Sequence, residues 1–221
     1  MKLDLNQSLK REFERISSLL GKENVFLVGG VVRDSLLHKE TYDLDIATPL
    51  KPEVVHSHFQ KSLYYPRFGT VSFRENGIEV TIATFRKEQS YLDFRHPLDV
   101  VFVEDIESDF TRRDFTVNAI YADSNLNIID PTGFGIKDID DKIIRMIGDP
   151  DIRLKEDPLR IIRAYRFSLG LCFSIESSLL RSLERNRGLI SCLNPNKIKM
   201  EILKTDGEIR KKLIEKVYHR P

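Results

Sequence analysis

The chain has 221 residues, of which 41% are hydrophobic and 31% are charged, the ordinary balance of a globular protein of one or two domains. No apolar run approaches the ~20 residues of a membrane helix, and the charged N-terminal segment lacks the apolar core of a signal peptide. The two cysteines, Cys172 and Cys192, are too few for a disulfide framework or a cysteine zinc site. We therefore expect a soluble cytoplasmic protein with no membrane partner.

The formal net charge of +1 hides an uneven distribution. Residues 151–221 hold 16 Lys and Arg against 9 Asp and Glu, a net charge of +7. The chain totals of 35 and 34 leave 19 and 25 for residues 1–150, a net charge of −6. An acidic half followed by a basic half indicates either a metal-binding part joined to a part that meets a polyanion, or an uneven solvated surface.

The first elements are short. An amphipathic helix is predicted by the spacing of Leu5, Leu9, Phe13, Ile16 and Leu20, with Gly21 as its stop signal. The apolar run 25–28 predicts a buried strand that enters a turn at Gly29 and Gly30, and a helix is expected over 31–38. The alternation over 43–47 predicts a strand with one acidic and one apolar face, followed by a helix at about 51–61.

A β-hairpin is the next feature. Val71 and Phe73 alternate with polar residues before Asn76 and Gly77, a preferred two-residue turn. The returning strand places Ile78, Val80 and Ile82 on one face and Glu79, Thr81 and Ala83 on the other.

The remaining pattern divides the chain into two domains. Further strands are predicted over 117–122, 126–129 and 143–147, and from Asp151 the pattern is helical almost to the end, with Leu159, Ile162 and Phe167 among the buried candidates. The predicted fold is therefore a mixed α/β domain over 1–148 followed by a helical domain over 149–221.

Asp43 and Asp45 are the first candidate site residues. Residues i and i+2 of a strand project from the same face, about 7 Å apart at the backbone. Two carboxylates that converge in this way suit a hard cation such as Mg²⁺. An isolated Asp-x-Asp pair is more often solvated, so the surrounding residues decide between the two interpretations.

Three neighbouring features favour a site. Gly29 and Gly30 let the backbone approach a phosphate closely, and the following helix offers its N–H groups, although a plain strand-to-helix turn has the same pattern. Arg33 in the first turn adds a charge-assisted contact. Glu79 is a candidate third carboxylate, with an exposed strand residue as the alternative.

These stretches together resemble the class II tRNA nucleotidyltransferase family, which comprises CCA-adding enzymes and bacterial poly(A) polymerases. The resemblance runs in the family's order over roughly residues 25–170. It is carried by LVGGVVRDSLL (27–37), DLDIAT (43–48), IEVTIATFR (78–86), YLDFRHP (91–97), RRDFTVNAIYA (112–122), DPTGFGIKDI (130–139), IRMIGDP (144–150) and EDPLRIIRAYRF (156–167).

The resemblance implies a polymerase-beta-like nucleotidyltransferase head and an all-helical neck. Asp43 and Asp45 correspond to the metal-binding pair and Glu79 to a third acidic partner, with two Mg²⁺ ions expected. Gly29, Gly30 and Arg33 correspond to the triphosphate cradle. The segment that grips phosphates and ribose corresponds to Arg112, Arg113, Asp114 and Asn118, for which a solvated arginine pair and a capping asparagine are the structural alternatives.

The stretch 156–160 has two interpretations. Pro158 suits the first turn of a helix, and Asp157 and Arg160 at i, i+3 would then share a face. In the family such a pair reads the incoming base, so that the protein acts as template. The alternative is an ion pair between Glu156 and Arg160 along the helix. Arg163 and Arg166 continue near the same face. Arg163 is a candidate for both nucleotide and RNA binding, and Arg166 is a candidate for RNA binding.

The resemblance weakens beyond the neck. Family members carry a longer helical body and tail, which we expect to be absent here, and their later Glu-Arg signature would fall near Asn196 and Lys197, with only Glu201 matching its end.

The expected function is the addition of C, A or both from CTP and ATP to the 3′ end of tRNA, with release of pyrophosphate. The alternatives are a poly(A) polymerase, a small-molecule nucleotidyltransferase and a non-catalytic RNA-binding relative. The oligomeric state stays open.

Overall fold

The structure is a computed structural model that describes residues 1–91 and 97–218. Within these residues a seven-stranded sheet has the order β3-β4-β5-β2-β1-β8-β9. Its strands are β1 (Phe26–Val28), β2 (Asp43–Thr48), β3 (Leu63–Tyr65), β4 (Thr70–Glu75), β5 (Ile78–Thr84), β8 (Tyr121–Ala122) and β9 (Ile128–Ile129). Strands β2 and β5 are parallel and the other neighbours antiparallel, which confirms the predicted mixed sheet.

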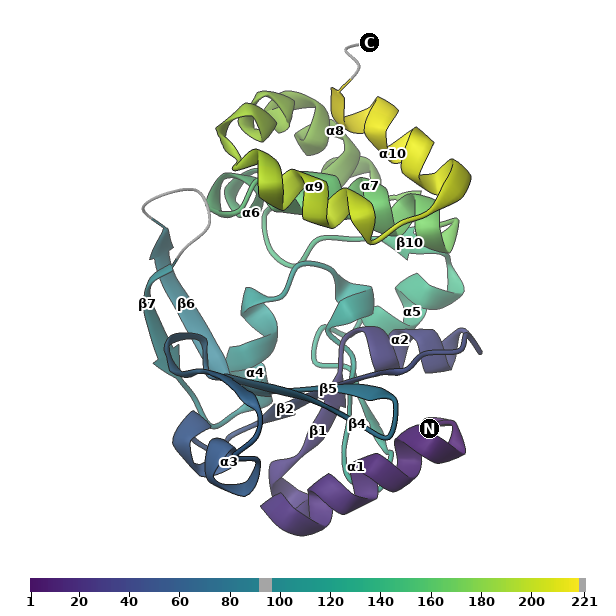
Figure 1. Cartoon of the computed structure of the whole chain (residues 1–221). Coiled ribbons are helices and arrows are strands. Elements are labelled where there is room, and N and C mark those ends of the chain that lie inside the picture. Colours follow the sequence, from purple (N-terminus) through teal and green to yellow (C-terminus); the bar gives the residue numbers. More distant parts are fainter. Residues whose placement is uncertain (92–96, 219–221) are drawn as a thin grey trace.

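Helices cover both faces of this sheet (Figure 1). Helices α1 (Gln7–Leu20) and α3 (Pro52–His58) lie on one side, and α2 (Gly30–Leu36) and α4 (Ile106–Asp109) lie on the other. The Asn6 side chain caps α1 by accepting from the Leu9 N–H at 2.9 Å, which satisfies one of the free donors at the helix start. As the spacing predicted, Leu9, Phe13 and Ile16 are buried.

The β4–β5 hairpin forms at the predicted turn. Asn76 and Gly77 have φ of 51° and 81°, the positive values that a two-residue hairpin turn of this type requires. A second hairpin was not predicted: β6 (Arg86–Tyr91) pairs with β7 (Pro97–Phe102) and stands beside the sheet. Most of the YLDFRHP stretch, residues 92–96, lies outside the described residues.

The short elements that follow are less regular than predicted. The 3₁₀ turn η4 (Thr116–Asn118) overlaps the start of the stretch 117–122, and only the end of that stretch forms a strand, β8. Another 3₁₀ turn, η3 (Phe110–Arg112), follows α4 directly. Helix α5 (Gly135–Asp140) then leads to β10 (Ile143–Ile144), which is shorter than the strand expected over 143–147.

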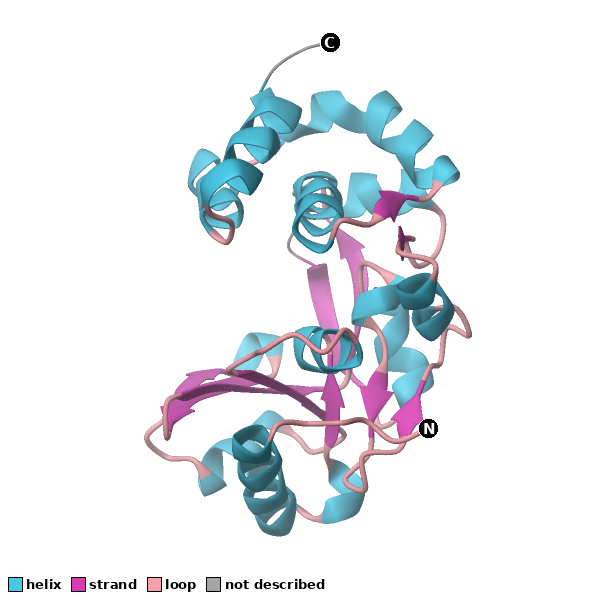
Figure 2. Cartoon of the chain, turned by 90° about the vertical axis from the view of Figure 1, so that its right-hand side faces the viewer, coloured by secondary structure: helices cyan, strands magenta, loops and turns pink. Residues whose placement is uncertain are grey.

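Residues 150–218 form a layer of helices above the sheet, here called the helical half, and residues 1–149 are the sheet half (Figure 2). The helical half comprises α6 (Pro150–Glu156), α7 (Leu159–Leu171), α8 (Ser177–Asn186), η5 (Arg187–Cys192), α9 (Pro195–Leu203) and α10 (Gly207–Tyr218). No helix in the described part of the chain is long and apolar enough to cross a membrane.

The expectation of a purely helical second half is wrong at one place. Ser174–Ile175 forms β11, which pairs in parallel with β10 of the sheet half. Helix α7 ends at Leu171. The next residue, Cys172, has a φ of 58° that turns the backbone out of the helix, and the chain then continues extended.

One hydrophobic core joins the two halves. It runs from Leu3 near the N-terminus to Val217 in α10 without a break. At the junction, Phe115 of the sheet half contacts Phe167 of α7 edge to face, with ring centroids 5.8 Å apart. The helical half is therefore held against the sheet half by packing, and its residues are positioned relative to those of the sheet.

Candidate active site

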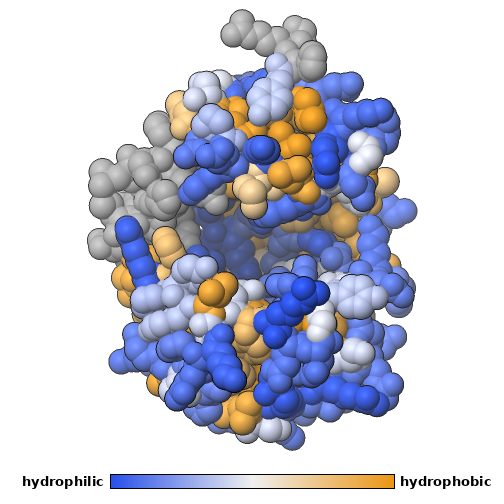
Figure 3. Space-filling model, in the orientation of Figure 1, coloured by the Kyte–Doolittle hydropathy of each residue, from blue (hydrophilic) through white to orange (hydrophobic). Residues whose placement is uncertain are grey.

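A cavity of about 580 Å³ opens between the sheet half and the helical half, and Figure 3 shows the molecule hollowed there with hydrophilic residues around the opening. Every site residue predicted from the sequence lines this cavity except Glu79. The lining includes Gly29, Gly30, Arg33, Asp43, Asp45, Arg112, Arg113, Asp114, Asn118, Asp157, Arg160, Arg163 and Arg166.

The carboxylate pair lies beside the glycine turn. Asp43 and Asp45 both come from β2, and the turn after β1 brings Gly29 next to them with a φ of 77°. A Cβ atom built on Gly29 would lie 3.5 Å from Asp45 Oδ2, and one on Gly30 would lie 3.9 Å from the same atom. The glycines thus leave the space beside the carboxylate open, as a ligand that approaches the backbone requires.

Asp45 is half-buried in the floor of the cavity. Burial, together with the charge of Asp43, raises the pKa of Asp45 to about 6, although Arg113 and Arg33 oppose this increase. A cation bound between the two carboxylates would relieve both the burial cost and the repulsion. The donor set, two carboxylates lining an open cavity, therefore fits a divalent cation.

The prediction that Glu79 joins this pair is wrong. Glu79 is the register neighbour of Asp43 on β5, but its side chain is 62% exposed and lies 3.6 Å from Arg74 of β4. It borders a different cavity, which is lined by residues of α1, α3, β4 and β5. Among the described residues, no group of three His, Cys, Asp or Glu is placed to hold a metal ion.

Arg33 is held against the wall of the cavity. Its guanidinium donates to Asn118 Oδ1 at 2.6 Å and to the Asp34 carboxylate at 2.8 and 2.9 Å. Asn118 in turn donates to Asp114 at 3.2 Å. The alternative of a helix-capping Asn118 is therefore excluded, because both ends of its amide are used in the cavity wall.

Asp109 holds the arginine pair of the cavity in place, and the sequence analysis missed it. This fully buried carboxylate accepts from Arg112 and Arg113 at 2.8 Å and from the Tyr121 hydroxyl at 2.6 Å. Burial opposes its ionisation, but Arg113 and Arg112 outweigh that effect and hold the pKa of Asp109 well below its usual range. The signal was its position three and four residues before the arginine pair, on the turn that carries them.

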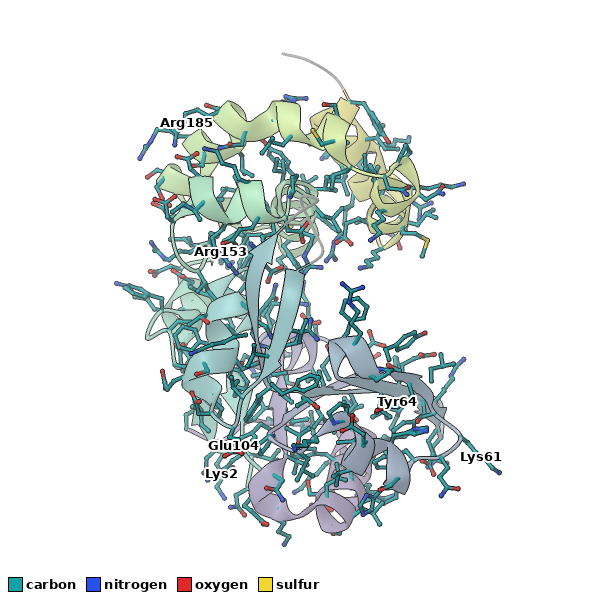
Figure 4. All side chains as sticks on the ribbon, turned by 90° about the vertical axis from the view of Figure 1, so that its left-hand side faces the viewer. Lys2, Lys61, Tyr64, Glu104, Arg153 and Arg185 are labelled. Atoms are coloured by element: carbon teal, nitrogen blue, oxygen red, sulfur yellow. The ribbon has the colours of Figure 1, made fainter. Side chains whose placement is uncertain are left out.

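The arginine pair is also fixed from the helical half. Arg153 of α6 donates to the carbonyl oxygens of Arg112 at 2.8 Å and Arg113 at 3.1 Å, and Figure 4 shows Arg153 at the junction between the two halves. Arg112 and Arg113 are accordingly not a solvated pair.

Asp114 connects the sheet half to α7. It accepts from Arg163 Nε at 2.8 Å and from the Phe115 N–H at 2.8 Å. Burial alone would raise its pKa, but the charge and hydrogen bonds of Arg163, helped by Asn118, lower the pKa of Asp114 to about 2. Arg163 therefore neutralises a buried carboxylate, in addition to lining the cavity.

Asp157 does not lie on helix α7. It is extended, with φ of −140° and ψ of 95°, and its carboxylate accepts from the Leu159 N–H at 3.0 Å at the start of α7. The residue before a proline is disfavoured in the helical region, so Pro158 separates Asp157 from the helix. The expected i, i+3 helical pair is therefore wrong in geometry, although Asp157 and Arg160 line the same cavity.

Arg160 forms the ion pair considered from the sequence. Its guanidinium lies 3.1 Å from Glu156 and donates to the carbonyl oxygens of Arg153 at 2.8 Å and Arg112 at 3.2 Å. Only 5% of the residue is exposed. The ion pair is confirmed, and base reading by the same side chain stays a prediction.

Glu201 completes the wall on the side of α9. It is buried, accepts from Arg166 at 2.6 Å and Lys204 at 2.8 Å, and lies 3.6 Å from Arg163. Burial raises its pKa, but Arg166 and Arg163 lower it by a larger total amount. The residue at the end of the incomplete Glu-Arg signature thus binds the arginines of α7.

The fold and the cavity are those expected of a nucleotidyltransferase, and the family comparison confirms this class. Residues 25–145 match the model of the poly A polymerase head domain. The chain belongs to this family of nucleotidyltransferases.

The chain is similar to enzymes that act on tRNA. It is 39% identical over 180 residues to the CCA-adding enzyme of Bacillus pumilus. The aligned region covers 81% of this chain and 45% of that protein. The crystal structure of the Bacillus stearothermophilus CCA-adding enzyme in complex with CTP has a TM-score of 0.83 and 32% identity, covering 96% of this chain and 52% of that one. A tRNA nucleotidyltransferase complexed with a primer tRNA and an incoming ATP analog has a TM-score of 0.74 and 27% identity, covering 94% and 62%.

The chain spans about half the length of the curated relatives it matches, 45% of the Bacillus pumilus enzyme and 51% of that from Pediococcus pentosaceus.

Proposed function

We propose that this protein adds C, A or both from CTP and ATP to the 3′ end of tRNA. The observation that carries the proposal is the single cavity in which a carboxylate pair and an open glycine turn face arginines from both halves. The similarity to proteins described as CCA-adding enzymes supports the choice of substrates. Such a substrate is consistent with a cytoplasmic location.

The two halves are proposed to divide the work. Residues 1–148 would be the head that performs the chemistry, and residues 149–221 the helical neck that selects the base and contacts RNA. This division is supported by the origin of the lining residues. The carboxylates and the glycine turn come from the sheet half, and Asp157, Arg160 and Arg163 come from the helical half.

Asp43 and Asp45 are proposed to hold Mg²⁺, with two ions expected. Bound there, the metal would lower the pKa of the attacking hydroxyl and neutralise the triphosphate. The 3′-oxygen of the RNA would form a bond to the α-phosphorus as the bond to the pyrophosphate oxygen breaks, and the hydroxyl proton would pass to solvent water. Glu79 is left out of this set because its side chain borders another cavity.

The triphosphate is proposed to bind between the glycine turn and the arginine pair. Gly29 and Gly30 would let the phosphates approach the backbone. Arg33, Arg112 and Arg113 would supply the charges. Their carboxylate partners, Asp34 for Arg33 and the buried Asp109 for the arginine pair, hold them in place before the nucleotide arrives. Asp114 and Asn118 are proposed to act through Arg163 and Arg33, to which they are bonded.

Base selection is proposed to involve Asp157, which precedes α7, and Arg160 in the first turn of α7, because both line the cavity. Two of the nitrogens of Arg160 already bind Glu156 and backbone carbonyls, so it would read a base only with its remaining donor capacity or after a change of partner. RNA contact through Arg163 and Arg166 has the same requirement, since both guanidinium groups bind buried carboxylates.

The test is incubation of the purified protein with Mg²⁺ and labelled tRNA that lacks its terminal nucleotides, supplying each triphosphate separately. We expect the wild-type protein to add nucleotides from CTP, from ATP or from both. Asp43→Ala and Asp45→Ala proteins that fold normally should lose this addition. Wild-type turnover in either folded variant would overturn the assignment of the carboxylate pair.

A poly(A) polymerase is the second candidate, favoured by the family model that the chain matches. The same assay separates the two functions. A CCA-type enzyme stops after at most three nucleotides, whereas a poly(A) polymerase continues with ATP alone.

A further inference from the structure

Phe167 of α7 lies beneath a group of three arginines. It is 8% exposed and lines both the main cavity and a smaller adjoining cavity of about 290 Å³. The guanidinium carbons lie over its ring at distances from the centroid of 5.1 Å for Arg33, 5.2 Å for Arg163 and 4.1 Å for Arg166.

The ring is the one contact that these arginines share among the described residues. Arg33 pairs with Asp34, whereas Arg163 pairs with Asp114 and both Arg163 and Arg166 approach Glu201. No carboxylate pairs with all three in the part of the chain that the structure describes. Three like charges converge there, and an aromatic face attracts a cation without adding a negative charge that would repel a triphosphate.

The orientation of the ring is set by the core. Phe115, which is fully buried in the sheet half, contacts Phe167 edge to face at 79°. Phe167 therefore belongs to the rigid junction between the halves, and its exposed face is presented to arginines from α2 and α7. A rigid support of this kind reduces the rotamer freedom that long arginine side chains would otherwise lose on binding a ligand.

We propose that Phe167 is a positioning residue that supports Arg33, Arg163 and Arg166 so that the guanidinium groups of Arg33 and Arg163 bind the phosphates of a nucleoside triphosphate, with Arg166 held beside them. The proposal rests on the proposed function for the identity of the ligand. Phe167 acts through the arginines, and Asp43 and Asp45 on β2 do not depend on its ring for their position.

The test compares Phe167→Leu with Phe167→Tyr and with a matched control, Tyr165→Leu. Tyr165 lies on the same helix, is also 8% exposed and has Lys216 over its ring at 5.9 Å, but it does not line the main cavity. Equilibrium binding of CTP and ATP is measured by calorimetry without RNA, and kcat and KM are measured with tRNA.

Phe167→Leu is expected to raise the Kd and KM for both triphosphates about 10-fold, the size of one or two lost cation–π contacts, with a smaller change in kcat. Phe167→Tyr keeps the ring face and should restore wild-type binding, and Tyr165→Leu should leave binding unchanged. If Phe167→Leu does not fold, Phe167→Met replaces it with a flexible side chain of similar size that also lacks the ring.

The proposal would be overturned if folded Phe167→Leu or Phe167→Met bound triphosphates as tightly as Tyr165→Leu does. It would also be overturned if Phe167→Tyr bound them as weakly as the variants without the ring. If the wild-type protein binds triphosphates and adds no nucleotide to tRNA, the proposed function fails, while the binding comparison still decides the role of Phe167.

Discussion

Asp45→Asn is expected to stabilise the metal-free protein at pH 8. Burial and the charge of Asp43 raise the pKa of Asp45 to about 6, whereas an Asp in an unfolded chain has a pKa of about 3.9. The difference corresponds to roughly 3 kcal/mol, so the expected gain in unfolding free energy is about 1–3 kcal/mol. A group retained for activity at a cost in stability has this signature.

The pH dependence of the gain follows from the direction of the pKa change. Between pH 4 and pH 6 the folded protein holds this proton more tightly than the unfolded chain does. The wild-type protein therefore loses stability as the pH rises through this window. The advantage of Asp45→Asn should disappear below about pH 4, where Asp45 is neutral in both states.

The assay is urea unfolding followed by circular dichroism, in EDTA at pH 4, 6 and 8, and again with Mg²⁺. Asp43→Asn is the control, because Asp43 is exposed and its replacement should give a smaller gain. Mg²⁺ should stabilise the wild-type protein more than it stabilises Asp45→Asn, so the difference in unfolding free energy between the two proteins should become smaller. An Asp45→Asn protein that is no more stable than the wild type in EDTA at pH 8 would refute the reasoning.

Arg160→Ala should cost about 0.5–1.5 kcal/mol of stability in urea unfolding, since it removes three hydrogen bonds, although Arg153 still donates to Glu156 and Arg112 and the Asp157 N–H still donates to the Arg153 carbonyl oxygen. If Arg160 also reads the base, kcat/KM ratios for the four triphosphates should become more equal, whereas unchanged ratios would leave only the ion pair. Asp109→Ala should cost about 3–5 kcal/mol, because Arg112 and Arg113 lose a buried partner, and a loss below 1 kcal/mol by the same method would contradict that view. Affinity for tRNA should fall steeply between low and physiological salt in a filter-binding titration, and a flat profile would mean that the +7 charge of residues 151–221 meets no polyanion.

Features set by neighbours in the chain were predictable. The Asn76-Gly77 turn and the alternation of Asp43 and Asp45 depend on backbone periods of a few residues. The glycine turn after β1 is similarly local. The predicted mixed sheet and the helices after residue 150 are both present in the structure, because hydrophobic periodicity persists through each of these elements.

The misjudged residues depend on partners elsewhere in the fold. Glu79 was placed in the site from its strand face and the family resemblance, but its side chain is exposed and lies near Arg74 across the hairpin. Asp157 was expected on a helix, but it is extended and the helix begins only after Pro158. The strand at Ser174–Ile175 forms because β10 lies beside it, and a two-residue strand has no periodicity to detect.

The sequence by itself determined that two carboxylates share a strand face and that a glycine turn follows the first strand, because both features follow from local backbone geometry. Only the tertiary structure decided how the cavity is closed. Arg163 reaches Asp114 across 49 positions, and Arg33 reaches Phe167 from another helix. Burying the shared core brings α7 onto the sheet, and side chains that are distant in the chain then become partners that no local pattern specifies.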